Sequence, residues 1–330
     1  MRTNGFVFGK FYPLHNGHVA LIEYAKSQCS TLTVLVCCSD KERAVSHSVR
    51  VNWLKDTVGA VPGVDIRLLE YKESELPNTS VSSRKVSKAW ANRFAQSLPT
   101  VDLLVTSEPY GDYVAEYMGI EHVSFDADRS RISISSTDIR KDLLRYWQII
   151  PEAVQKHFQQ KVAILGTEST GKTTLANKLT EFFSGQIVEE AARGIIENST
   201  EYSKEDLIKT AICHAECIKT AVTNTTQPLV VIDTDVYVTQ SYAYFEFGAP
   251  IDLPGWVYDE NKVDLRLYLN ADIPYVQDGT RMPKDIRNKL DEQHRKTLGV
   301  YSRDFIEING GYREREMQAI TKINELYSVF

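Results

Sequence analysis

Short apolar runs alternate with amphipathic stretches along the first half of the chain. Each run has the length of a buried strand, and the runs occupy residues 6–8, 31–37, 64–69, 101–106 and 122–125. Helical spacing of apolar residues marks the segments between them, at 18–26, 49–58, 82–96, 113–118 and after Ser136. Strands alternating with helices predict right-handed βαβ crossovers and a parallel sheet. Ligands of such sheets bind at the carboxyl ends of the strands.

A second alternating series follows a break in the pattern at residues 147–151. Its strands are expected at 161–165, 187–188, 229–232, 265–269 and 305–308, and its long helices at 204–223 and 314–327. The pattern predicts an α/β protein with two doubly wound parallel-sheet domains, at residues 1–158 and 159–330. The polar stretch 71–83, which contains Pro77 and Asn78, predicts an exposed loop.

Composition narrows the class of ligand and of compartment. A net charge of −6 and a pI near 5.7 argue against bulk binding to nucleic acid or to an anionic membrane, so we expect small-molecule partners. No signal peptide and no apolar run of spanning length is present in the sequence. An odd count of five cysteines favours a reducing compartment, so we expect a cytoplasmic protein, for which a homo-oligomer is an open option.

The first expected strand ends at Gly9 and leads into a loop with two histidines. A residue without Cβ at this point lets a nucleotide approach the backbone. His15 and His18 are three residues apart, so both project from the first turn of the next helix, whose N-terminus favours phosphate. With Lys10 they form a clasp for a triphosphate. Adenylyl transfer at such a site depends on positioning and charge stabilisation, and no side chain need act as nucleophile.

A second polar cluster lies near the end of the first domain. Ser136 or Thr137 is expected to cap the last helix and to offer hydroxyl and N–H groups to phosphate oxygens. Arg140 adds a guanidinium fork for the β- and γ-phosphates. Alone, the hydroxyl residues indicate an ordinary helix cap and the two histidines a polar surface. Together, in one βα array, they predict a nucleotide site.

The segments Gly9-x-Phe11-x-Pro13-x-His15-x-Gly17-His18 and Ile134-Ser135-Ser136-Thr137-x-Ile139-Arg140 resemble the HxGH/ISSTxxR nucleotidyltransferase superfamily, which transfers AMP from ATP to a phosphate. The resemblance covers most of residues 1–150. It implies catalytic roles for His15, His18 and Arg140. The ATP-binding residues that it implies are Gly9, Lys10, Phe11, His15, His18, Ser135, Ser136, Thr137 and Arg140.

Two further residues of the first domain are candidates for substrate binding. Arg50-x-x-Trp53-Leu54 is similar to a segment of nicotinamide-mononucleotide adenylyltransferases, in which the arginine approaches the mononucleotide. Trp90 stands where such enzymes stack an aromatic ring on the pyridinium. A half-buried helix tryptophan is an equal alternative for Trp90, because amphipathic aromatic residues serve either purpose.

A phosphate-binding loop opens the second domain, directly after the strand expected at 161–165. The loop fits G-x-x-x-x-G-K-[ST], and an amphipathic helix follows it, which is the context that this motif requires. The apolar face of that helix is expected to contain Leu175, Leu179, Phe182 and Phe183. Lys172 is expected to bridge the β- and γ-phosphates, and the Thr173 hydroxyl to bind Mg²⁺. The expected ATP-binding residues are Gly166, Thr167, Glu168, Ser169, Thr170, Gly171, Lys172, Thr173 and Thr174.

Two aspartates end the third strand of this series. Asp233 fits the Walker-B pattern and is the expected Mg²⁺ ligand, directly or through water, together with Thr173. Asp235 is placed to orient or deprotonate a hydroxyl acceptor, and an N-cap of the following helix is a nearly equal alternative. Asp278-Gly279-Thr280-Arg281 occupies the place of a kinase lid, from which Arg281 reaches the transferred phosphate.

Three more residues of the second domain are candidates for the acceptor site. Glu190 and Arg193 follow the short strand at 187–188 and are placed to reach the acceptor, with a solvated helix ion pair as the alternative. Trp256, in a Pro-Gly turn, is a candidate for stacking on a flat cationic ring.

A P-loop kinase fused to a mononucleotide adenylyltransferase resembles the bifunctional nicotinamide-nucleotide adenylyltransferase/ribosylnicotinamide kinases over nearly the whole chain. The segments that carry the resemblance are Glu190-x-x-Arg193, Asp233-Thr234-Asp235, Asp278-Gly279-Thr280-Arg281 and Trp147-x-x-Ile150-Pro151. It implies a kinase that phosphorylates the 5′-hydroxyl of nicotinamide riboside, with Lys172, Asp233, Asp235 and Arg281 as catalytic residues. It also implies an adenylyltransferase that joins the mononucleotide to AMP, giving NAD⁺ and pyrophosphate. Each step uses Mg-ATP, so Mg²⁺ is the expected cofactor.

Some members of that family carry an N-terminal helix-turn-helix that represses transcription. Here the first catalytic strand is expected by Phe6, which leaves no room for a DNA reader, so repression is not expected.

Two other functions are compatible with part of this pattern. A flavin kinase/adenylyltransferase pairs the same two chemistries, but its kinase lacks a G-x-x-x-x-G-K-T loop after a strand. A nucleotide sensor with a regulatory P-loop domain is the non-enzymatic alternative. The set of Lys10, His15, His18 and Arg140 argues against a purely sensory first domain.

Overall fold

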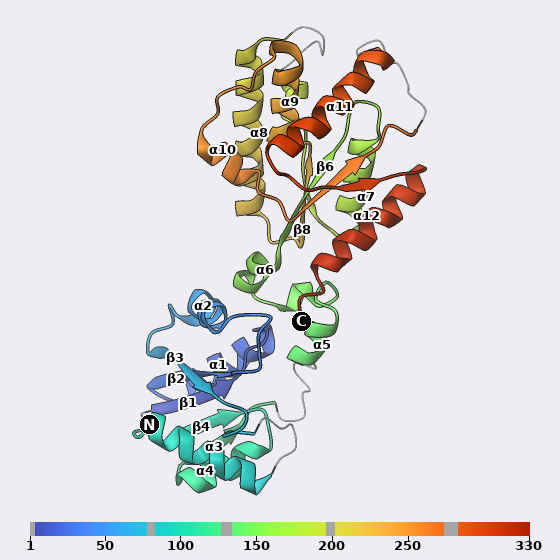
Figure 1. Ribbon diagram of the computed structural model, residues 1–330. Helices are drawn as coiled ribbons and strands as arrows, with labels where there is room; N and C mark the ends of the chain where they lie inside the picture. Colours follow the sequence, from blue (N-terminus) through green and yellow to red (C-terminus); the bar gives the residue numbers. More distant parts are fainter. Residues whose placement is uncertain (1–3, 78–82, 127–133, 196–201, 274–282) are drawn as a thin grey trace. The chain divides into compact units, whose positions relative to one another are not determined.

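Two five-stranded sheets organise the chain, and the strand pairs in both are parallel (Figure 1). The computed structural model describes residues 4–77, 83–126, 134–195, 202–273 and 283–330. Each sheet belongs to one of two compact units. Unit 1 consists of Met1–His157 with Val329–Phe330, and unit 2 of Phe158–Ser328. The predicted class, two doubly wound parallel α/β folds, is confirmed.

The sheet of unit 1 has the strand order β3-β2-β1-β4-β5. Its strands are β1 (Asn4–Gly9), β2 (Thr31–Ser39), β3 (Val64–Tyr71), β4 (Leu103–Thr106) and β5 (Glu121–Ser124). Its connecting helices are α1 (Asn16–Ser27), α2 (His47–Val58), α3 (Arg84–Ser97) and α4 (Tyr110–Met118). Three short helices follow, α5 (Ser136–Lys141), η1 (Trp147–Ile149) and α6 (Glu152–Phe158). The chain steps outward from β1 to β3 and then returns to β4, so α1 and α2 cover one face and α3 and α4 the other.

Burial explains why the first apolar run becomes a central strand. Phe6 and Val7 of β1, like Leu104 of β4, are fully buried, as expected where helices cover both faces of a parallel sheet. Phe94 of α3 packs on the same layer, with its ring centroid 5.5 Å from that of Phe6 and 4.5 Å from that of Phe8. This aromatic layer fixes α3 against the carboxyl end of β1.

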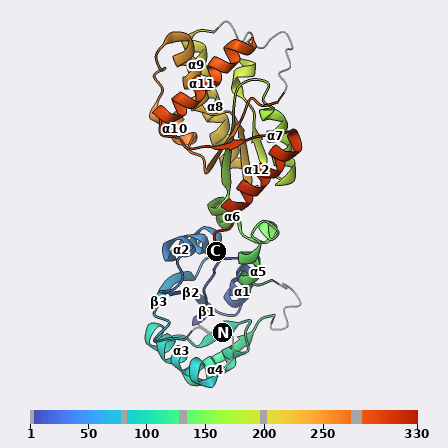
Figure 2. The ribbon, with the colours of Figure 1, turned by 45° about the vertical axis from the view of Figure 1, so that its right-hand side comes forward.

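The sheet of unit 2 has the strand order β10-β9-β6-β8-β7. Its strands are β6 (Gln160–Leu165), β7 (Gln186–Val188), β8 (Leu229–Asp233), β9 (Leu265–Leu269) and β10 (Ile306–Ile308). Its helices are α7 (Lys172–Phe182), η2 (Ala191–Gly194), α8 (Lys204–Asn224), α9 (Val236–Phe247), α10 (Gly255–Glu260), α11 (Lys284–Val300) and α12 (Tyr312–Leu326). Figure 2 shows α7 and α12 on one side of this sheet and α8, α9 and α11 on the other.

The hydrophobic pattern does not predict α11, although it is one of the longer helices of unit 2. Its buried face contains Arg287, His294 and Thr297 beside Leu290 and Leu298. Because polar residues occupy the inward face, no apolar stripe marks the helix in the sequence.

Two local expectations need correction, the first only in part. After Tyr71 the described residues 72–77 form a loop, and Lys72, Ser74, Glu75 and Pro77 are exposed as expected. Tyr71 and Leu76 are only 7% and 8% exposed, because both belong to the core beside α3; residues 78–82 lie outside the described part. Phe182, expected on the apolar face of α7, is 58% exposed. The helix ends at this residue, and Phe183 turns into the core instead.

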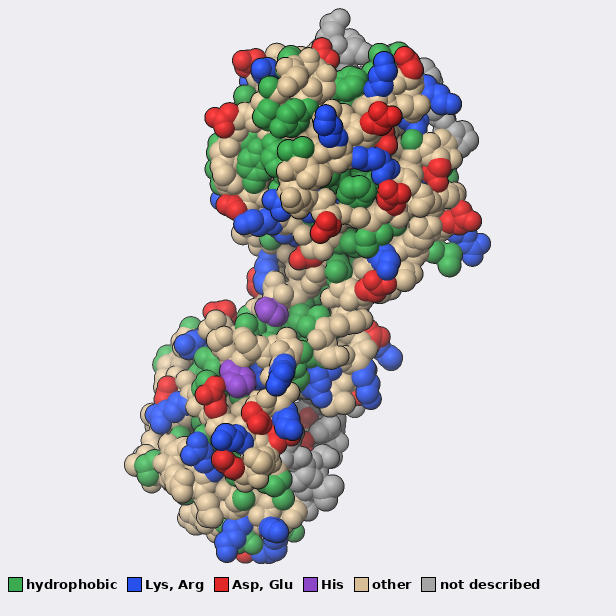
Figure 3. All heavy atoms as spheres, viewed as in Figure 1, with side chains coloured by type: hydrophobic (Ala, Val, Ile, Leu, Met, Phe, Trp, Pro, Cys, Tyr) green, Lys and Arg blue, Asp and Glu red, His purple; other side chains and the backbone are tan. Residues whose placement is uncertain are grey.

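Charged side chains of both signs are mixed on one face of the molecule. On the face drawn in Figure 3, Lys and Arg side chains are interspersed with Asp and Glu side chains over both units. The net charge of −6 is therefore not collected in one patch on that face. No helix within the described ranges is long and apolar enough to span a lipid bilayer.

Candidate functional sites

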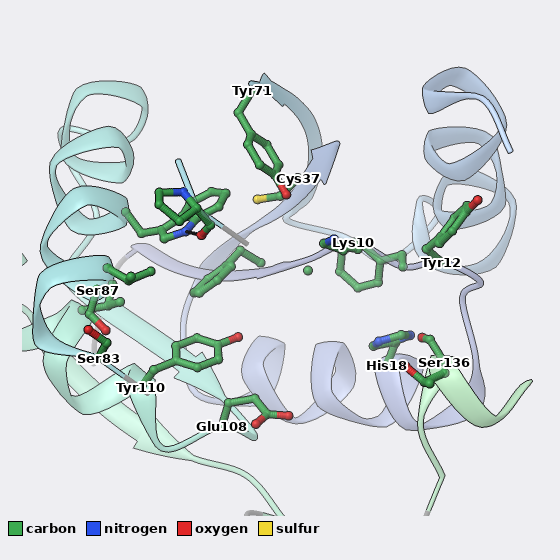
Figure 4. Close-up of a pocket in the computed structure, with 18 of the residues that line it drawn as sticks. Lys10, Tyr12, His18, Cys37, Tyr71, Ser83, Ser87, Glu108, Tyr110 and Ser136 are labelled. Atoms are coloured by element: carbon green, nitrogen blue, oxygen red, sulfur yellow. Dashed lines mark hydrogen bonds between the residues drawn. The ribbon is translucent and has the colours of Figure 1, made fainter. Parts of the chain in front are cut away.

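Unit 1 contains a cavity of about 540 Å³ at the carboxyl ends of β1, β2 and β3 (Figure 4). It opens where the strand order reverses between β1 and β4, which is where doubly wound sheets bind ligands. His18 and Ser136 lie side by side at one end of the cavity, whereas Ser83 and Ser87 of the α3 segment lie at the other. The expected ATP-binding residues that line it are Gly9, Lys10, Phe11, His18, Ser136, Thr137 and Arg140.

His15 and His18 form a reciprocal cap at the start of α1. His15 is the N-cap residue, and its Nδ1 accepts the Gly17 N–H at 3.1 Å. Nδ1 of His18 accepts the His15 N–H at 3.3 Å, and the two ring centroids are 3.7 Å apart. Because both Nδ1 atoms are acceptors, each neutral ring carries its proton on Nε2. The pair therefore presents Nε2–H donors with a defined tautomer.

His18 is held in its neutral form. Burial, and to a smaller extent the neighbouring His15, keeps the pKa of His18 well below its ordinary value of 6.5. Phe11 contributes to this apolar surrounding, with its ring edge-on to the imidazole at a centroid distance of 5.0 Å. The fixed positive charge at this end of the cavity thus comes from Lys10 and Arg140.

Glu42 links Lys10 to Arg50. Its carboxylate accepts from Lys10 Nζ at 2.6 Å and from Arg50 Nη1 at 2.5 Å. Burial alone would raise the pKa of Glu42, but the hydrogen bonds from both cations outweigh it and hold that pKa below its ordinary value. Arg50 itself is fully buried and lies outside the cavity lining, 4.3 Å from the Tyr12 ring centroid. Nη1 of Arg50 also donates to the Lys10 carbonyl at 3.3 Å, so the contacts of Arg50 are to the loop that begins at Gly9.

Ser135, and not Ser136 or Thr137, caps α5. Its hydroxyl accepts the Asp138 N–H at 3.2 Å and donates to the Asp138 carboxylate at 2.6 Å. Ser136 donates instead to the Pro13 carbonyl at 3.1 Å. The cap is thus one residue earlier than expected, and Ser136 joins α5 to the histidine loop.

Arg140 reaches the same loop from the first turns of α5. It donates to the Tyr12 carbonyl at 2.5 Å and to the Thr137 hydroxyl at 2.9 Å. Its guanidinium carbon lies 5.4 Å from the Tyr12 ring centroid. These contacts bring both sequence motifs of unit 1 to one side of the cavity.

Trp90 of α3 lines the cavity among other aromatic rings. Its ring is nearly parallel to that of Phe8, with centroids 6.5 Å apart and planes inclined by 18°. Tyr71 meets it edge-on at 4.8 Å, and the indole N–H donates to the Pro77 carbonyl at 3.3 Å. The polar atom of Trp90 is thus bonded within the protein, and its ring packs against Phe8 and Tyr71 while it borders the cavity.

Several lining residues were not singled out from the sequence. They are Phe8, Tyr12, Cys37, Tyr71, Ser83, Ser87, Glu108 and Tyr110. A signal existed for most of them, because Phe8, Cys37 and Tyr71 lie at the ends of β1, β2 and β3, and Glu108 and Tyr110 follow β4. Ligands bind at the strand ends of such sheets, so position alone marks these residues.

The phosphate-binding loop of unit 2 depends on residues with a left-handed backbone. Gly166, Ser169 and Gly171 have φ values of 135°, 61° and 87°. A Cβ at Gly166 would lie 2.6 Å from the Leu269 carbonyl oxygen, so only glycine fits there. Successive backbone N–H groups in such a loop form a concave site for an anion.

Lys172, Thr173 and Asp233 meet at this loop. Lys172 Nζ donates to the Thr167 carbonyl at 3.1 Å, and the Thr173 hydroxyl donates to the Asp233 carboxylate at 2.7 Å. Asp233 ends β8 and is 1% exposed. A hydroxyl and a carboxylate beside a phosphate loop are the hard oxygen donors that Mg²⁺ prefers, so these residues fit the expected cation.

Asp235 caps α9 and is engaged on both oxygens. Oδ1 accepts the N–H groups of Tyr237 and Val238, at 3.0 and 3.3 Å. Oδ2 accepts from Arg266 Nε at 2.9 Å. The carboxylate is 1% exposed. The structure therefore supports the N-cap interpretation over a general base.

For the remaining candidate residues of unit 2, the structure gives a place in the chain and a degree of exposure. Glu190 is partly buried and immediately precedes η2. Trp256 is the second residue of α10 and is 38% exposed. Thr174 is exposed on α7. The Arg193 side chain and Arg281 lie outside the described part of the chain.

Comparisons with known proteins separate the same two regions. Residues 6–142 match the family described as cytidylyltransferase-like, and residues 161–315 match a family described as AAA domain. The trifunctional NAD biosynthesis/regulator protein NadR of Escherichia coli (strain K12) is 34% identical over 301 residues, which span 85% of this chain and 72% of the relative. The NadR protein of Salmonella typhimurium is 33% identical over 297 residues, spanning 84% and 71%.

Two solved structures share the fold over the whole chain. A crystal structure of NadR protein in complex with NR has a TM-score of 0.65 at 22% sequence identity, covering 100% of this chain and 97% of that one. A second, of NadR protein in complex with NAD and AMP-PNP, has a TM-score of 0.62 at 23% identity with the same coverage. At these identities the likeness concerns the fold.

Proposed function

The chain belongs to the family of the trifunctional NAD biosynthesis/regulator proteins NadR, and from this we propose that its two units catalyse consecutive steps of NAD synthesis. Unit 2 phosphorylates the 5′-hydroxyl of nicotinamide riboside with ATP. Unit 1 then joins the resulting mononucleotide to the AMP moiety of a second ATP, giving NAD⁺ and pyrophosphate. We assign residues 1–158 to the adenylyltransferase domain and residues 159–330 to the kinase domain.

One observation carries the proposal for unit 1. A single cavity has imidazole, ammonium and guanidinium groups at one end and stacked aromatic rings at the other. The basic end suits the triphosphate of ATP, and the face of Trp90 suits the cationic pyridinium of the mononucleotide. The two reacting phosphates then meet between these ends, so the cavity supplies orientation for the transfer.

In that arrangement the mononucleotide phosphate attacks the α-phosphorus of ATP, and pyrophosphate leaves. The Nε2–H groups of His15 and His18 donate to the phosphate oxygens on which charge develops. Lys10 and Arg140 stabilise the leaving pyrophosphate. For this, Lys10 exchanges its ion pair with Glu42 for the phosphates, while Arg50 keeps Glu42 in place.

In unit 2 the backbone N–H groups of the phosphate loop hold the β-phosphate, and Lys172 bridges the β- and γ-phosphates. Mg²⁺, held through Thr173 and Asp233, would neutralise charge on the transferred group. The riboside 5′-hydroxyl attacks the γ-phosphorus, the bond to the β-phosphate oxygen breaks, ADP leaves, and the hydroxyl proton is released to solvent. Glu190, Arg193, Trp256 and Arg281 stay candidates for the acceptor and lid roles, and Asp235 keeps its structural role.

The ligands that this function requires are ATP, nicotinamide riboside, nicotinamide mononucleotide and NAD⁺. We propose no nucleic-acid or membrane partner. Five free cysteines favour a reducing compartment such as the cytoplasm.

The decisive experiment incubates the protein with Mg-ATP and nicotinamide riboside and follows nicotinamide mononucleotide and NAD⁺ by chromatography. We expect the mononucleotide to form first and NAD⁺ to follow, with pyrophosphate released in step with NAD⁺. Supplying riboflavin in place of the riboside tests the flavin alternative and should give no product. Binding of ATP without turnover of either pyridine substrate would instead indicate a sensor.

A further inference from the structure

Arg315 is a buried cation near the start of α12, only 2% exposed. Its Nε donates to the Gly310 carbonyl at 2.7 Å, Nη1 to the Thr170 carbonyl at 2.6 Å and Nη2 to the Asn270 carbonyl at 2.8 Å. Nη2 also donates to the carboxylate of Asp272. A guanidinium has five N–H donors in a rigid planar fork, so most of its donors are used inside the protein.

The acceptors of Arg315 come from three separate segments. Thr170 belongs to the phosphate loop after β6, Asn270 follows β9, and Gly310 follows β10. The strands β6, β9 and β10 are consecutive neighbours in the sheet. A single side chain therefore ties the phosphate loop to the carboxyl ends of the two strands beside it.

The bond to Thr170 sets the direction of the next backbone N–H. The Thr170 carbonyl and the Gly171 N–H belong to one planar trans peptide, in which the C=O and N–H bonds point in opposite directions. Because the carbonyl points to Arg315, the Gly171 N–H points away from the guanidinium. Gly171 has φ 87°, a backbone conformation that glycine adopts without strain. Fixing this peptide thus fixes one of the donors that a phosphate loop offers to its anion.

We propose that Arg315 is a positioning residue of the kinase site, which orients the Gly171 amide toward the phosphates of the donor nucleotide through the Thr170 carbonyl. This rests on the proposed kinase function of unit 2. Arg315 does not touch the substrate, and its effect is on the shape of the loop. Lysine cannot take its place, because an ammonium group lacks the fork that reaches three carbonyls at once.

The test measures nucleotide binding at unit 2 alone. Hydrogen exchange of the peptide that covers residues 166–174 is followed while Mg-AMP-PNP is titrated, since unit 1 also binds ATP under the proposed function. Arg315→Lys should raise the half-saturating concentration, and the KM for ATP in riboside phosphorylation, by at least about tenfold, a factor ordinary for lost charged hydrogen bonds. The KM for riboside and the conversion of supplied mononucleotide to NAD⁺ should stay unchanged.

Arg303→Lys is the matched control, because Arg303 is a partly buried arginine of the same unit whose guanidinium lies 4.9 Å from the Tyr237 ring centroid. It should leave the titration unchanged. Asp272→Asn keeps Arg315 but weakens its anchor, and should shift the titration in the same sense by a smaller factor.

A wild-type titration curve for Arg315→Lys overturns the proposal, as does an equal rise in both KM values. If unit 2 of Arg315→Lys shows no amides protected from exchange, that variant is unfolded and the test passes to Asp272→Asn. A wild-type titration curve for Asp272→Asn then overturns the proposal. A wild-type protein whose loop is protected by nucleotide but which does not phosphorylate riboside refutes the kinase function and leaves the role of Arg315 in the loop standing.

Discussion

The imidazole rings of His15 and His18 lie 3.7 Å apart, and each uses its Nδ1 to accept a backbone N–H of the same turn. The cap therefore does two things at once. It satisfies amides that the helix leaves without partners, and it fixes the tautomer of both rings. A substitution at either position changes the start of α1, and one at His18 also removes a donor from the lining of the cavity.

His18→Ala should lower the rate of mononucleotide adenylylation by roughly 10²–10³, the usual effect of removing one preorganised donor from a transition state. His18→Gln should recover part of this loss, because its side-chain amide restores an N–H donor. Riboside phosphorylation by the same proteins should stay at the wild-type rate. Steady-state assays of both half-reactions check this, and a loss below tenfold in His18→Ala contradicts the assigned role.

Lys172→Ala should abolish riboside phosphorylation, because it removes the cation that bridges the β- and γ-phosphates. Adenylylation of supplied mononucleotide should survive. The matched control is Lys178→Ala on the same helix, whose ammonium pairs with Glu316 at 2.8 Å and is 46% exposed. That variant should keep both activities. Comparable loss of both activities in folded Lys172→Ala would argue that the two sites are not separate.

Glu42→Gln should destabilise unit 1 by about 1–3 kcal/mol, because the buried guanidinium of Arg50 loses its counter-charge while the amide keeps an acceptor. Denaturation is followed by tryptophan fluorescence in a Trp256→Phe background, in which the remaining tryptophans, Trp53, Trp90 and Trp147, all lie in unit 1. The pKa of Glu42 is lowered, so its contribution is present above the ordinary value of 4.5 and is lost as the pH falls through the lowered pKa. The difference in the free energy of unfolding between the wild type and Glu42→Gln should therefore become smaller at acidic pH.

The control for that change is Glu70→Gln, because the Glu70 carboxylate is 66% exposed and lies 2.8 Å from Nδ1 of His47. It should leave the stability of unit 1 unchanged within the error of the measurement. Equal stability of Glu42→Gln and wild type near neutral pH would show that the Lys10–Glu42–Arg50 link contributes nothing.

The buried histidines of unit 2 predict a loss of stability in mild acid. Burial first, and then the charges of Lys172 and Arg295, lowers the pKa of His294 to about 3. Burial lowers the pKa of His214 to about 4. In the unfolded chain a histidine has a pKa near 6.5. Below that pH the unfolded state binds protons, whereas these two rings stay neutral in the folded state. Stability should therefore fall by up to about 1.4 kcal/mol per pH unit for each ring as the pH drops from 6.5 to 5.

Hydrogen exchange of peptides from α11, measured across that pH range and corrected for the intrinsic exchange rate, reports this stability. His294→Gln should reduce the slope of the unfolding free energy against pH by roughly half, since His214 still takes up a proton on unfolding. His47→Gln, in unit 1, should leave the slope for α11 unchanged. A slope that is the same in wild type and His294→Gln rules out the contribution of His294.

Helices and strands with an apolar inward face were predictable from the sequence. The positions of the two glycine-containing loops that follow such strands were predictable as well. The strands leading to Gly9 and Gly166 follow directly from short apolar runs. Contacts between distant polar residues were not predictable in the same way. Arg50 pairs with Glu42, and Asp235 with Arg266, through partners that only the fold brings together.

The predictions of local detail were wrong where a single residue decides the geometry. Ser135, Ser136 and Thr137 are all acceptable caps in sequence, and only the backbone at Ser135 makes it the cap. Phe182 and Phe183 compete for the core at the end of α7, and the point where the helix stops settles which one is buried. The inward face of α11 is polar because Arg287 and His294 find partners within unit 2, which no periodicity reports.

The strand that carries each phosphate loop stands in the middle of its sheet, with β2 and β4 beside β1 and with β8 and β9 beside β6. On the ribosome this order has a consequence. The loop after β6 is synthesised before either neighbour, since β8 begins only at Leu229 and β9 at Leu265. Until then β6 is a bare apolar strand with two open edges, the kind of segment that recruits other strands. The nascent chain thus exposes an apolar strand beside an unfinished active-site loop, and that interval is when a holding chaperone would matter most.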